Sequence, residues 1–362
     1  MIYLDNAATT PICDAAKRAI IKHIDDFGNP SSAHELGRQS RILIEDARER
    51  IAKCINAEPD EIYFTSGGSE ANSWALHDRF SISSNFEHHS VEAHISNVYI
   101  DNDGFVKTSF FNHINSPFSK YLDVASCMYV NNELGTIQPI KDIADIAHGK
   151  HMLFHTDAVQ AVGHIQIDVK ELGCDMLSAS AHKFGGPKGI GFLYIKNGVD
   201  RKILIEGGKQ EQGFRGGTEN ILGIVAMAAA LEESVEHMNE RNEYVKHLRD
   251  TLLDRLLQIP GSHLNGSLEN RVSSNINIRF DGVPGSRLVT LCSLYGVYIS
   301  SGSACNEGIS EPSHVLKAIG LSDEDALNSV RITLSHNNTE KDIDTATDII
   351  TALVRQIRSN NA

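Results

Sequence analysis

Short runs of apolar residues recur through the first half of the chain, and each run ends in polar residues or glycine. They cover residues 62–65, 124–130, 152–155, 176–178 and 190–195, and a helical pattern over residues 140–147 lies between two of them. Short apolar runs with such boundaries are typical of buried strands. Strands that alternate with helices predict an α/β fold with a largely parallel sheet and a functional site at the carboxyl ends of its strands.

The second half has a different pattern. Residues 221–257 carry apolar residues at helical spacing, and Pro260-Gly261 ends the segment. Such a long helical segment is expected to pass from a large domain into a smaller one. Apolar runs at residues 275–280, 289–299 and 331–334 predict that the smaller domain is α+β.

Composition narrows the class of protein. The 362 residues include 41% hydrophobic and 22% charged residues, which is ordinary for a globular enzyme. The formal net charge of −14 argues against generic binding to nucleic acid or to an anionic membrane surface. No apolar run has the length of a membrane span, and the N-terminus lacks the pattern of a signal peptide. We therefore expect the protein to be located in the cytoplasm.

Polar residues follow the predicted strands, and the most informative of them is Lys183. This lysine lies in the run Ser180-Ala181-His182-Lys183, which two glycines follow closely. Glycine allows a close approach to a bulky group, and serine and histidine can donate to a phosphate. A lysine that forms a Schiff base, together with a separate carboxylate for the ring nitrogen, is what pyridoxal 5′-phosphate (PLP) requires.

The carboxylate and the phosphate site each have a structural alternative. Asp157 ends a predicted strand and is placed to pair with a pyridine nitrogen, although an aspartate there can also cap a helix. Residues 65–72 contain Gly67, Gly68 and Ser69 between a strand and a helix, which suits an anion at a helix N-terminus. The same residues also suit a plain turn capped by Ser69.

Histidine and cysteine provide weaker signals. His88 is suited to stack on a flat ring, but a single histidine is more often structural. Three further histidines, at positions 148, 151 and 155, straddle a helix end and a strand, so no metal site is expected. Cys305 lies in a run of small and polar residues, Gly302-Ser303-Ala304-Cys305, where a thiol would be accessible and could act as a nucleophile. The alternative is an exposed cysteine without a chemical role.

In this order, the motifs resemble those of the cysteine desulfurases of the NifS/IscS type, which are PLP enzymes of fold type I in the class V aminotransferase superfamily. The matching segments are residues 3–11, 28–38, 65–72, 87–88, 130–135, 155–160, 180–183, 210–220, 300–305, 311–313 and 330–331. The resemblance covers nearly the whole chain. It implies a large PLP-binding domain over residues 15–240 and a small domain formed by residues 1–14 and 241–362, which carries the cysteine loop.

The resemblance also implies roles for individual residues. Lys183 would bind PLP, Asp157 would pair with its ring nitrogen, Gln160 would pair with its ring hydroxyl, and His88 would stack on the ring. The phosphate would be held by Gly68, Ser69, Ser180, His182 and, from the second subunit of a homodimer, Thr218. Asn132 and Arg331 would bind the substrate carboxylate, and Cys305 would carry the sulfur as a persulfide.

The implied reaction converts L-cysteine to L-alanine and passes the sulfur to an acceptor protein, such as an iron–sulfur scaffold or a thiolation relay. A selenocysteine lyase, another class V enzyme and a non-catalytic sulfur-system adaptor are the alternatives. The chain is shorter than members of that family between Ser69 and His88 and between His88 and Asn132. The shorter segments bear on the surface near His88, on the catalytic rate and on the choice of the acceptor protein.

Overall fold

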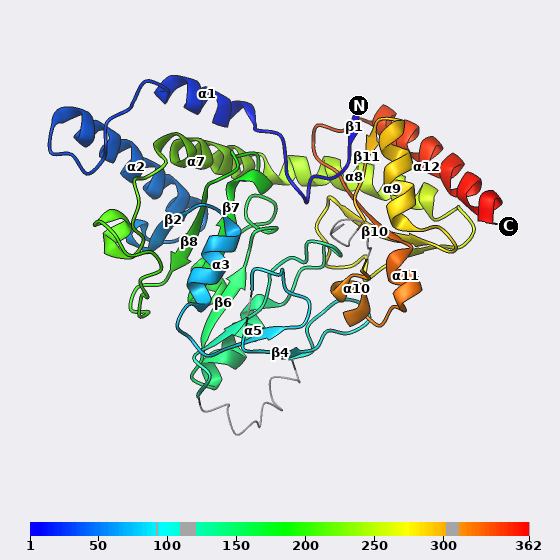
Figure 1. The fold of residues 1–362 in the computed structure, drawn as a ribbon, viewed down its shortest axis with the longest axis horizontal. Coiled ribbons are helices and arrows are strands. Elements are labelled where there is room, and N and C mark those ends of the chain that lie inside the picture. Colours follow the sequence, from blue (N-terminus) through cyan, green and yellow to red (C-terminus); the bar gives the residue numbers. More distant parts are fainter. Residues whose placement is uncertain (92, 109–120, 302–310, 362) are drawn as a thin grey trace.

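A seven-stranded sheet forms the centre of the larger part of the molecule (Figure 1). The computed structural model describes residues 1–91, 93–108, 121–301 and 311–361. In spatial order the strands are β2 (Ile62–Thr65), β8 (Gly191–Ile195), β7 (Met176–Ser180), β6 (Leu153–Asp157), β5 (Val124–Ser126), β3 (Ser81–Ser84) and β4 (Ile95–Val98). Only β8 runs antiparallel to its neighbours in this sheet, so the predicted largely parallel sheet is confirmed.

Helices cover this sheet. They are α1 (Asp14–His23), α2 (Glu35–Cys54), α3 (Gly68–Leu76), α5 (Ile140–Gly149), α6 (Val169–Leu172) and α7 (Ile221–Glu236), with short 3₁₀ helices η1 (Pro59–Glu61), η3 (Ala181–Lys183) and η4 (Gln210–Gly213). Helix α3 packs on β2, β6, β7 and β8, whereas α1 and α2 pack on α7. Strands β2, β5, β7 and β8 are buried throughout, which explains their apolar sequences.

The helical segment predicted over residues 221–257 is two helices. Helix α7 ends at Glu236, and α8 (Met238–Leu256) begins after His237. The apolar side chains of α7, such as Leu231, join the core around the large sheet, whereas those of α8, such as Leu252, join a separate core. The two helices therefore bury their apolar residues in two different cores.

The separate core belongs to the C-terminal part of the molecule. There β10 (Asn275–Phe280) lies between β9 (Ser262–Leu264) and β12 (Ser329–Thr333) in an antiparallel sheet. The remaining elements are α9 (Gly285–Leu294), β11 (Val297–Tyr298), α10 (His314–Ala318), α11 (Asp323–Leu327) and α12 (Glu340–Asn361). The N-terminal strand β1 (Ile2–Tyr3) pairs with β11 (Figure 1). Ile2 and Leu4, the residue after this strand, join the same core. The predicted domain boundaries stay a prediction, since Val315, Leu316 and Ala326 of α10 and α11 join the core around the large sheet.

The sequence of strand β3 gave no strand signal. The β3 sequence Ser-Ile-Ser-Ser is largely polar, yet all of its residues are buried. Its hydroxyl groups find local partners: Ser83 Oγ donates to the carbonyl of Ser84 at 3.1 Å, and Ser81 Oγ lies 3.2 Å from His94 Nδ1. A polar sequence can therefore occupy the sheet because its hydroxyls are satisfied there.

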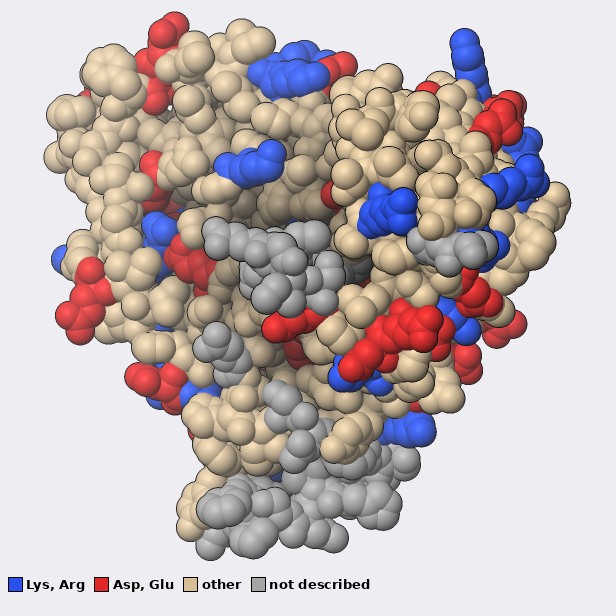
Figure 2. Space-filling model, turned by 45° about the vertical axis from the view of Figure 1, so that its right-hand side comes forward, with Lys and Arg blue, Asp and Glu red and all other residues tan. Residues whose placement is uncertain are grey.

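Charged side chains are scattered over the surface. On the face in Figure 2, the described Lys and Arg residues are interspersed with Asp and Glu and form no continuous basic area. Among the described helices, none combines the length and the apolar character needed to cross a membrane.

Candidate functional site

The carboxyl ends of the strands open into a cavity of about 350 Å³. Of the residues predicted for the site, the following line it: Gly68, Ser69, His88, Asn132, Asp157, Gln160, Ser180, His182, Lys183 and Arg331. Thr218 is exposed and does not line this cavity, and Cys305 lies outside the described residues. Segments from both cores of the molecule therefore meet at one place.

Lys183 is held at this cavity by the N-terminal segment. It follows β7 in η3, and its Nζ donates to the carbonyls of Ala7 at 2.6 Å and Ala8 at 2.8 Å. Burial, together with the nearby Arg331, lowers the pKa of Lys183 to about 8, against the opposing effects of Asp157 and Asp5. The amine is therefore partly neutral near pH 8, which is the form that reacts with a carbonyl group.

Asp157 is a buried carboxylate at the end of β6. Its Oδ1 accepts from the Val159 amide at 2.9 Å, and its Oδ2 accepts from Asn72 Nδ2 at 2.7 Å. Burial raises the pKa of Asp157, while these two hydrogen bonds favour its charged form. The next helix, α6, begins only at Val169, so the helix-cap interpretation of Asp157 is wrong.

A chain of hydrogen bonds connects Asp157 to His88. Asn72 Nδ2 also donates to Ser90 Oγ at 2.8 Å, and Ser90 Oγ lies 2.7 Å from His88 Nδ1. The Ser90 amide donates to the same ring nitrogen at 3.1 Å, so Nδ1 accepts and the proton of the neutral ring is on Nε2. Loss of solvation lowers the pKa of His88, which favours the neutral ring.

The N-terminus of α3 provides an anion site. Gly67 is the N-cap and makes no side-chain cap bond, and Ser69 lies inside the helix, so the interpretation of Ser69 as a cap is wrong. A Cβ atom at Gly68 would lie 2.5 Å from Val159 Cγ2, so only glycine fits there. Free amides at the start of a helix attract anions, and the lining residues Ser180 and His182 lie at the same cavity.

His182 is neutral at physiological pH. Desolvation lowers its pKa to about 4, and the neighbouring Lys183 contributes. Its Nδ1 lies 3.2 Å from Thr9 Oγ1. The ring can thus offer a hydrogen bond without adding a charge.

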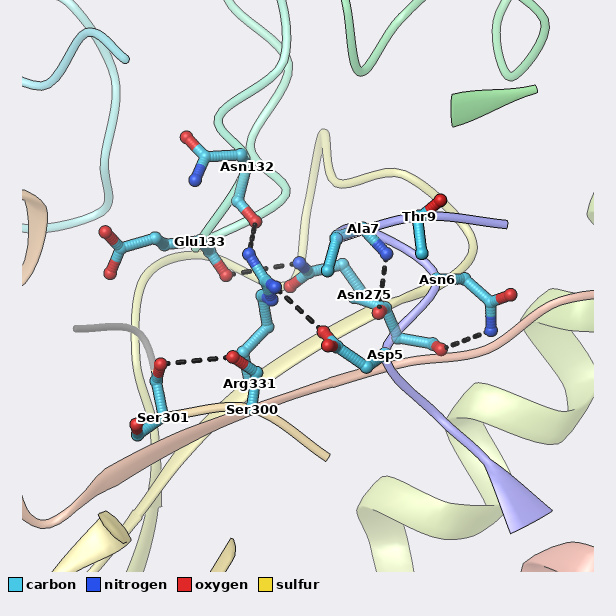
Figure 3. Close-up of polar contacts among 12 residues, drawn as sticks. Asp5, Asn6, Ala7, Thr9, Asn132, Glu133, Asn275, Ser300, Ser301 and Arg331 are labelled. Atoms are coloured by element: carbon cyan, nitrogen blue, oxygen red, sulfur yellow. Dashed lines mark hydrogen bonds and ion pairs between the residues drawn. The ribbon is translucent and has the colours of Figure 1, made fainter. Parts of the chain in front are cut away.

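Arg331 enters the cavity from β12 of the smaller sheet (Figure 3). Its Nη1 donates to the Asn132 carbonyl at 3.0 Å, and its Nη2 donates to Asp5 Oδ1 at 2.9 Å. Gln160 Nε2 donates to the Ala7 carbonyl at 2.9 Å, so it touches the same carbonyl as Lys183. The N-terminal segment therefore lies between the lysine and the arginine.

A second, larger cavity adjoins the first. It has a volume of about 600 Å³ and shares Ala7, Asn132, Gln160 and Lys183 with the smaller one. Asp157 and the α3 N-terminus line only the smaller cavity. The smaller cavity is therefore the candidate site.

The histidines at positions 148, 151 and 155 do not gather around a metal ion. His148 Nε2 lies 2.7 Å from Asp175 Oδ2, and His155 bonds to Ser126 and Ser178. Over the described ranges, no group of three or more His, Cys, Asp or Glu side chains has a metal-binding arrangement.

Sequence reasoning gave no role to three residues of this network: Asp5, Asn72 and Ser90. Asp5 and Asn72 fall inside the matching motifs, so the signal for them was present, but their partners are distant in sequence. Ser90 lies outside the motifs, and its spacing of two residues from His88 was the available signal. Thr218 does not cap α7, because Asn220 is the N-cap and its side chain accepts from the Gly223 amide.

Comparisons with known proteins agree with this geometry. The model of the family "Aminotransferase class-V" matches residues 2–345. The chain is similar to a protein named cysteine desulfurase IscS from Methanosarcina thermophila, with 41% identity over 383 aligned positions that cover 99% of this chain and 93% of the relative. The alignment is longer than the chain of 362 residues, so the relative has segments that this chain lacks.

Solved structures show the same likeness. A structure titled "NIFS-LIKE PROTEIN" is similar with a TM-score of 0.90 and 34% identity over 98% of this chain and 99% of its own. A structure titled "SspA in complex with cysteine" has a TM-score of 0.80 and 34% identity over 94% of this chain and all of its own. The fold is therefore PLP fold type I, as the resemblance implied. The chain belongs to the class-V aminotransferases, a family of PLP-dependent enzymes.

Proposed function

We propose that this protein is a PLP-dependent cysteine desulfurase, which converts L-cysteine to L-alanine and keeps the sulfur as a persulfide on Cys305. One observation carries the proposal: the amine of Lys183, with its lowered pKa, shares a cavity with the buried carboxylate of Asp157 and the guanidinium of Arg331. The similarity over nearly the full length to a protein named cysteine desulfurase supports the same conclusion.

The residues of the cavity fit PLP. The α3 N-terminus, where a Cβ at Gly68 would collide with Val159, suits the phosphate, with Ser69, Ser180 and His182 as further donors. Asp157 suits a protonated ring nitrogen, Gln160 suits the ring hydroxyl, and His88 suits stacking on the ring. The Asn72 Oδ1 atom is buried without a partner among the described residues, which leaves an acceptor beside Asp157. When bound, PLP withdraws electrons from the substrate carbon that bears the amino group.

Lys183 would do the proton chemistry. Its Nζ would hold PLP and, once the substrate has replaced it, take the proton from the substrate Cα. Arg331 and Asn132 would hold the substrate carboxylate, which fixes the Cα in place. The carboxylate of Asp157 would keep the ring nitrogen protonated by its negative charge.

Sulfur transfer requires a thiolate, and the described cysteines are poor candidates. Burial raises the pKa of all five, to about 11 for Cys54 and about 12 for Cys174 and Cys292, and Cys13 and Cys127 shift in the same direction. None of them lines the smaller cavity. Cys305 remains as the sulfur carrier.

The sulfur step needs no reactant other than the substrate and the Cys305 thiolate. The Cys305 thiolate would attack the substrate Sγ, and an S–S bond would form as the Cβ–Sγ bond breaks. The electron pair of the broken bond would stay on Cβ, which takes up a proton, and alanine would leave. An acceptor protein, such as an iron–sulfur scaffold or a thiolation relay, would then receive the sulfur.

The homodimer is the second part of the proposal. Thr218 is exposed and free to reach a neighbouring subunit. Large apolar side chains are exposed along α1, α2 and their connection: Ile21, Ile24, Phe27, Leu36 and Ile42. Exposed apolar groups concentrated in one stretch mark interaction surfaces. We place the dimer contact there and the enzyme in the cytoplasm.

The test is an assay of sulfide and alanine from L-cysteine by the purified, PLP-loaded enzyme. We expect equal amounts of both products and, without a reductant, an added sulfur atom on Cys305 in mass spectra. Lys183→Ala is expected to lose the yellow colour and the activity, whereas Lys188→Ala, an exposed lysine in the same loop, keeps both.

Other results would point elsewhere. Cys305→Ala is expected to keep the colour and lose the persulfide, and a persulfide on any of the five described cysteines would contradict the assignment. Selective turnover of selenocysteine would make the enzyme a selenocysteine lyase, and a colourless, inactive wild type would indicate a binding adaptor.

A further inference from the structure

We propose that Asp5 is a positioning residue for the substrate: it orients Arg331 so that the guanidinium receives the α-carboxylate of the amino acid. The inference rests on the proposed function, because it concerns how that substrate is bound. Asp5 itself has no contact with the substrate in this proposal. It acts through the ion pair with Arg331.

The ion pair divides the guanidinium into an occupied side and a free side. Arg331 Nη2 donates to Asp5 Oδ1 at 2.9 Å, and Nη1 donates to the Asn132 carbonyl at 3.0 Å. Figure 3 shows the two acceptors approaching the guanidinium from different directions. A guanidinium has five N–H groups, so most of its donors remain for a ligand.

One of the remaining donors is buried without a partner. The Arg331 side chain is 9% exposed, and its Nε has no hydrogen-bond partner among the described residues. An unpaired buried donor is costly, and a carboxylate that accepts from Nε and one Nη would satisfy it in the bidentate geometry that arginine favours. Arg331 lines the candidate site, where the substrate would lie.

The Asp5 backbone is fixed relative to Arg331. Thr333, two residues after Arg331 on β12, donates its amide to the Leu4 carbonyl at 2.7 Å and accepts from the Asn6 amide at 3.3 Å. Asn6 Nδ2 donates to the same Thr333 carbonyl at 2.8 Å. The carboxylate of Asp5 is therefore a rigid partner, and a mobile arginine would lose more conformational entropy when it binds a carboxylate.

Asn132, the other partner, is also held in place. Asn275 Nδ2 and Asn277 Nδ2 of β10 donate to the adjacent Glu133 carbonyl at 3.1 and 3.2 Å. The Asn132 acceptor is a backbone carbonyl, which no substitution removes. Asp5 is thus the partner of Arg331 that a substitution can test.

Asp5 also balances charge at the site. Arg331 and Lys183 are neighbouring cations, and Arg331 lowers the pKa of Lys183 while Asp5 raises it. The carboxylate of Asp5 compensates the guanidinium before the substrate arrives. The Asp5 side chain is 23% exposed, so solvent keeps this compensation moderate and an incoming carboxylate still binds.

The experiment compares Asp5→Ala and Asp5→Asn with the wild type in the PLP-loaded enzyme. We expect the KM for L-cysteine to rise about tenfold in Asp5→Ala and by less in Asp5→Asn, which keeps an oxygen acceptor. The kcat should stay within about twofold of the wild-type value. The contact between Arg331 and the substrate carboxylate is the same in the bound substrate and in the transition state, so its loss affects both equally. A tenfold change corresponds to about 1.4 kcal/mol.

Cysteamine, which has the amine and thiol of cysteine but no carboxylate, provides the second measurement. Its binding, followed by the visible absorbance of bound PLP, should be the same in the wild type and in both variants. Asp344→Asn is the matched control, because it removes a carboxylate that pairs with Arg255 far from this site. It should change neither quantity.

The outcomes separate the two proposals. Inactivity of the wild type towards cysteine would reject the proposed function, whatever the variants do. With an active wild type, an unchanged or lower KM in Asp5→Ala would reject the positioning role, as would an equal loss of cysteamine binding. If Asp5→Ala fails to fold, Asp5→Asn with the same two ligands decides the question.

Discussion

The environment of single side chains determines the chemistry of this site. Lys183 and Asp157 have opposite charges and both lie at a buried edge, yet burial shifts each pKa towards the neutral form: down for the amine and up for the carboxyl group. Hydrogen bonds from Asn72 and the Val159 amide oppose that shift for the carboxylate. The result is an amine that deprotonates easily beside a carboxyl group whose charged form two hydrogen bonds favour against the effect of burial.

The pKa of Lys183 predicts the pH dependence of cofactor binding. The neutral amine is the reactive form, so the rate at which the cofactor-free protein takes up PLP should rise with pH and level off above about pH 8. Stopped-flow absorbance between pH 6 and pH 10 measures it. An unperturbed lysine would give a rate that is still rising at pH 10. Such a profile would contradict the burial of this amine.

At the scale of elements, the junction between β2 and α3 sets the phosphate site. The strand ends at Thr65, Gly67 caps the helix, and the first amides of α3 face the cavity that Gly68 and Ser69 line. The turn that follows β6 brings Val159 against Gly68, so the segments after two strands of the sheet pack at the site. The close packing leaves no room for a side chain at Gly68.

Gly68→Val is therefore expected to weaken PLP binding at least tenfold, because its Cβ would lie 2.5 Å from Val159 Cγ2 and push the helix start away. Dialysis against buffer and titration with PLP measure the loss. Gly149→Ala is the control, since a Cβ there has no atom within 4 Å and the protein should bind PLP normally. Full retention of PLP by Gly68→Val would place the phosphate elsewhere.

At the scale of the whole molecule, two packed parts meet at the site, and a partner subunit is expected to complete it. Arg331 and Asp5 come from the part around β12 and β1, while Lys183 and Asp157 come from the large sheet. The N-terminal segment connects the two, since its carbonyls hold Lys183 and its Asp5 holds Arg331. Movement of one part against the other would alter the site.

The exposed apolar stretch on α1 and α2 predicts the dimer contact. Phe27 is 82% exposed, so Phe27→Asp should leave the folded subunit intact and weaken the dimer. Sedimentation velocity should show more monomer at low concentration, together with weaker PLP retention if Thr218 serves the neighbouring site. Leu294→Asp, at 75% exposure on α9, is the control and should remain dimeric. If Phe27→Asp and Leu294→Asp sediment alike, the dimer contact lies elsewhere.

Much of the site was predictable from the sequence, because short apolar runs predict buried strands. The polar residues that follow such strands meet at one edge of a parallel sheet. Lys183, Asp157 and Gly68 were predicted for that reason, and the motif order pointed to the cofactor. Strands β2, β7 and β8 were also predicted from the sequence, because a strand that is buried on both faces has a continuous apolar run. Strand β3, with its serines, was not.

Tertiary structure alone decided how distant segments combine. The bond between Asp5 and Arg331 spans nearly the whole chain, and the bonds from Asn72 to Asp157 and Ser90 join separate elements. A single sequence contains no distances between such residues, so their partners could not be inferred. The break at His237 was likewise not predicted: the apolar spacing is helical throughout residues 221–257, whereas the structure has two helices whose apolar side chains join different cores.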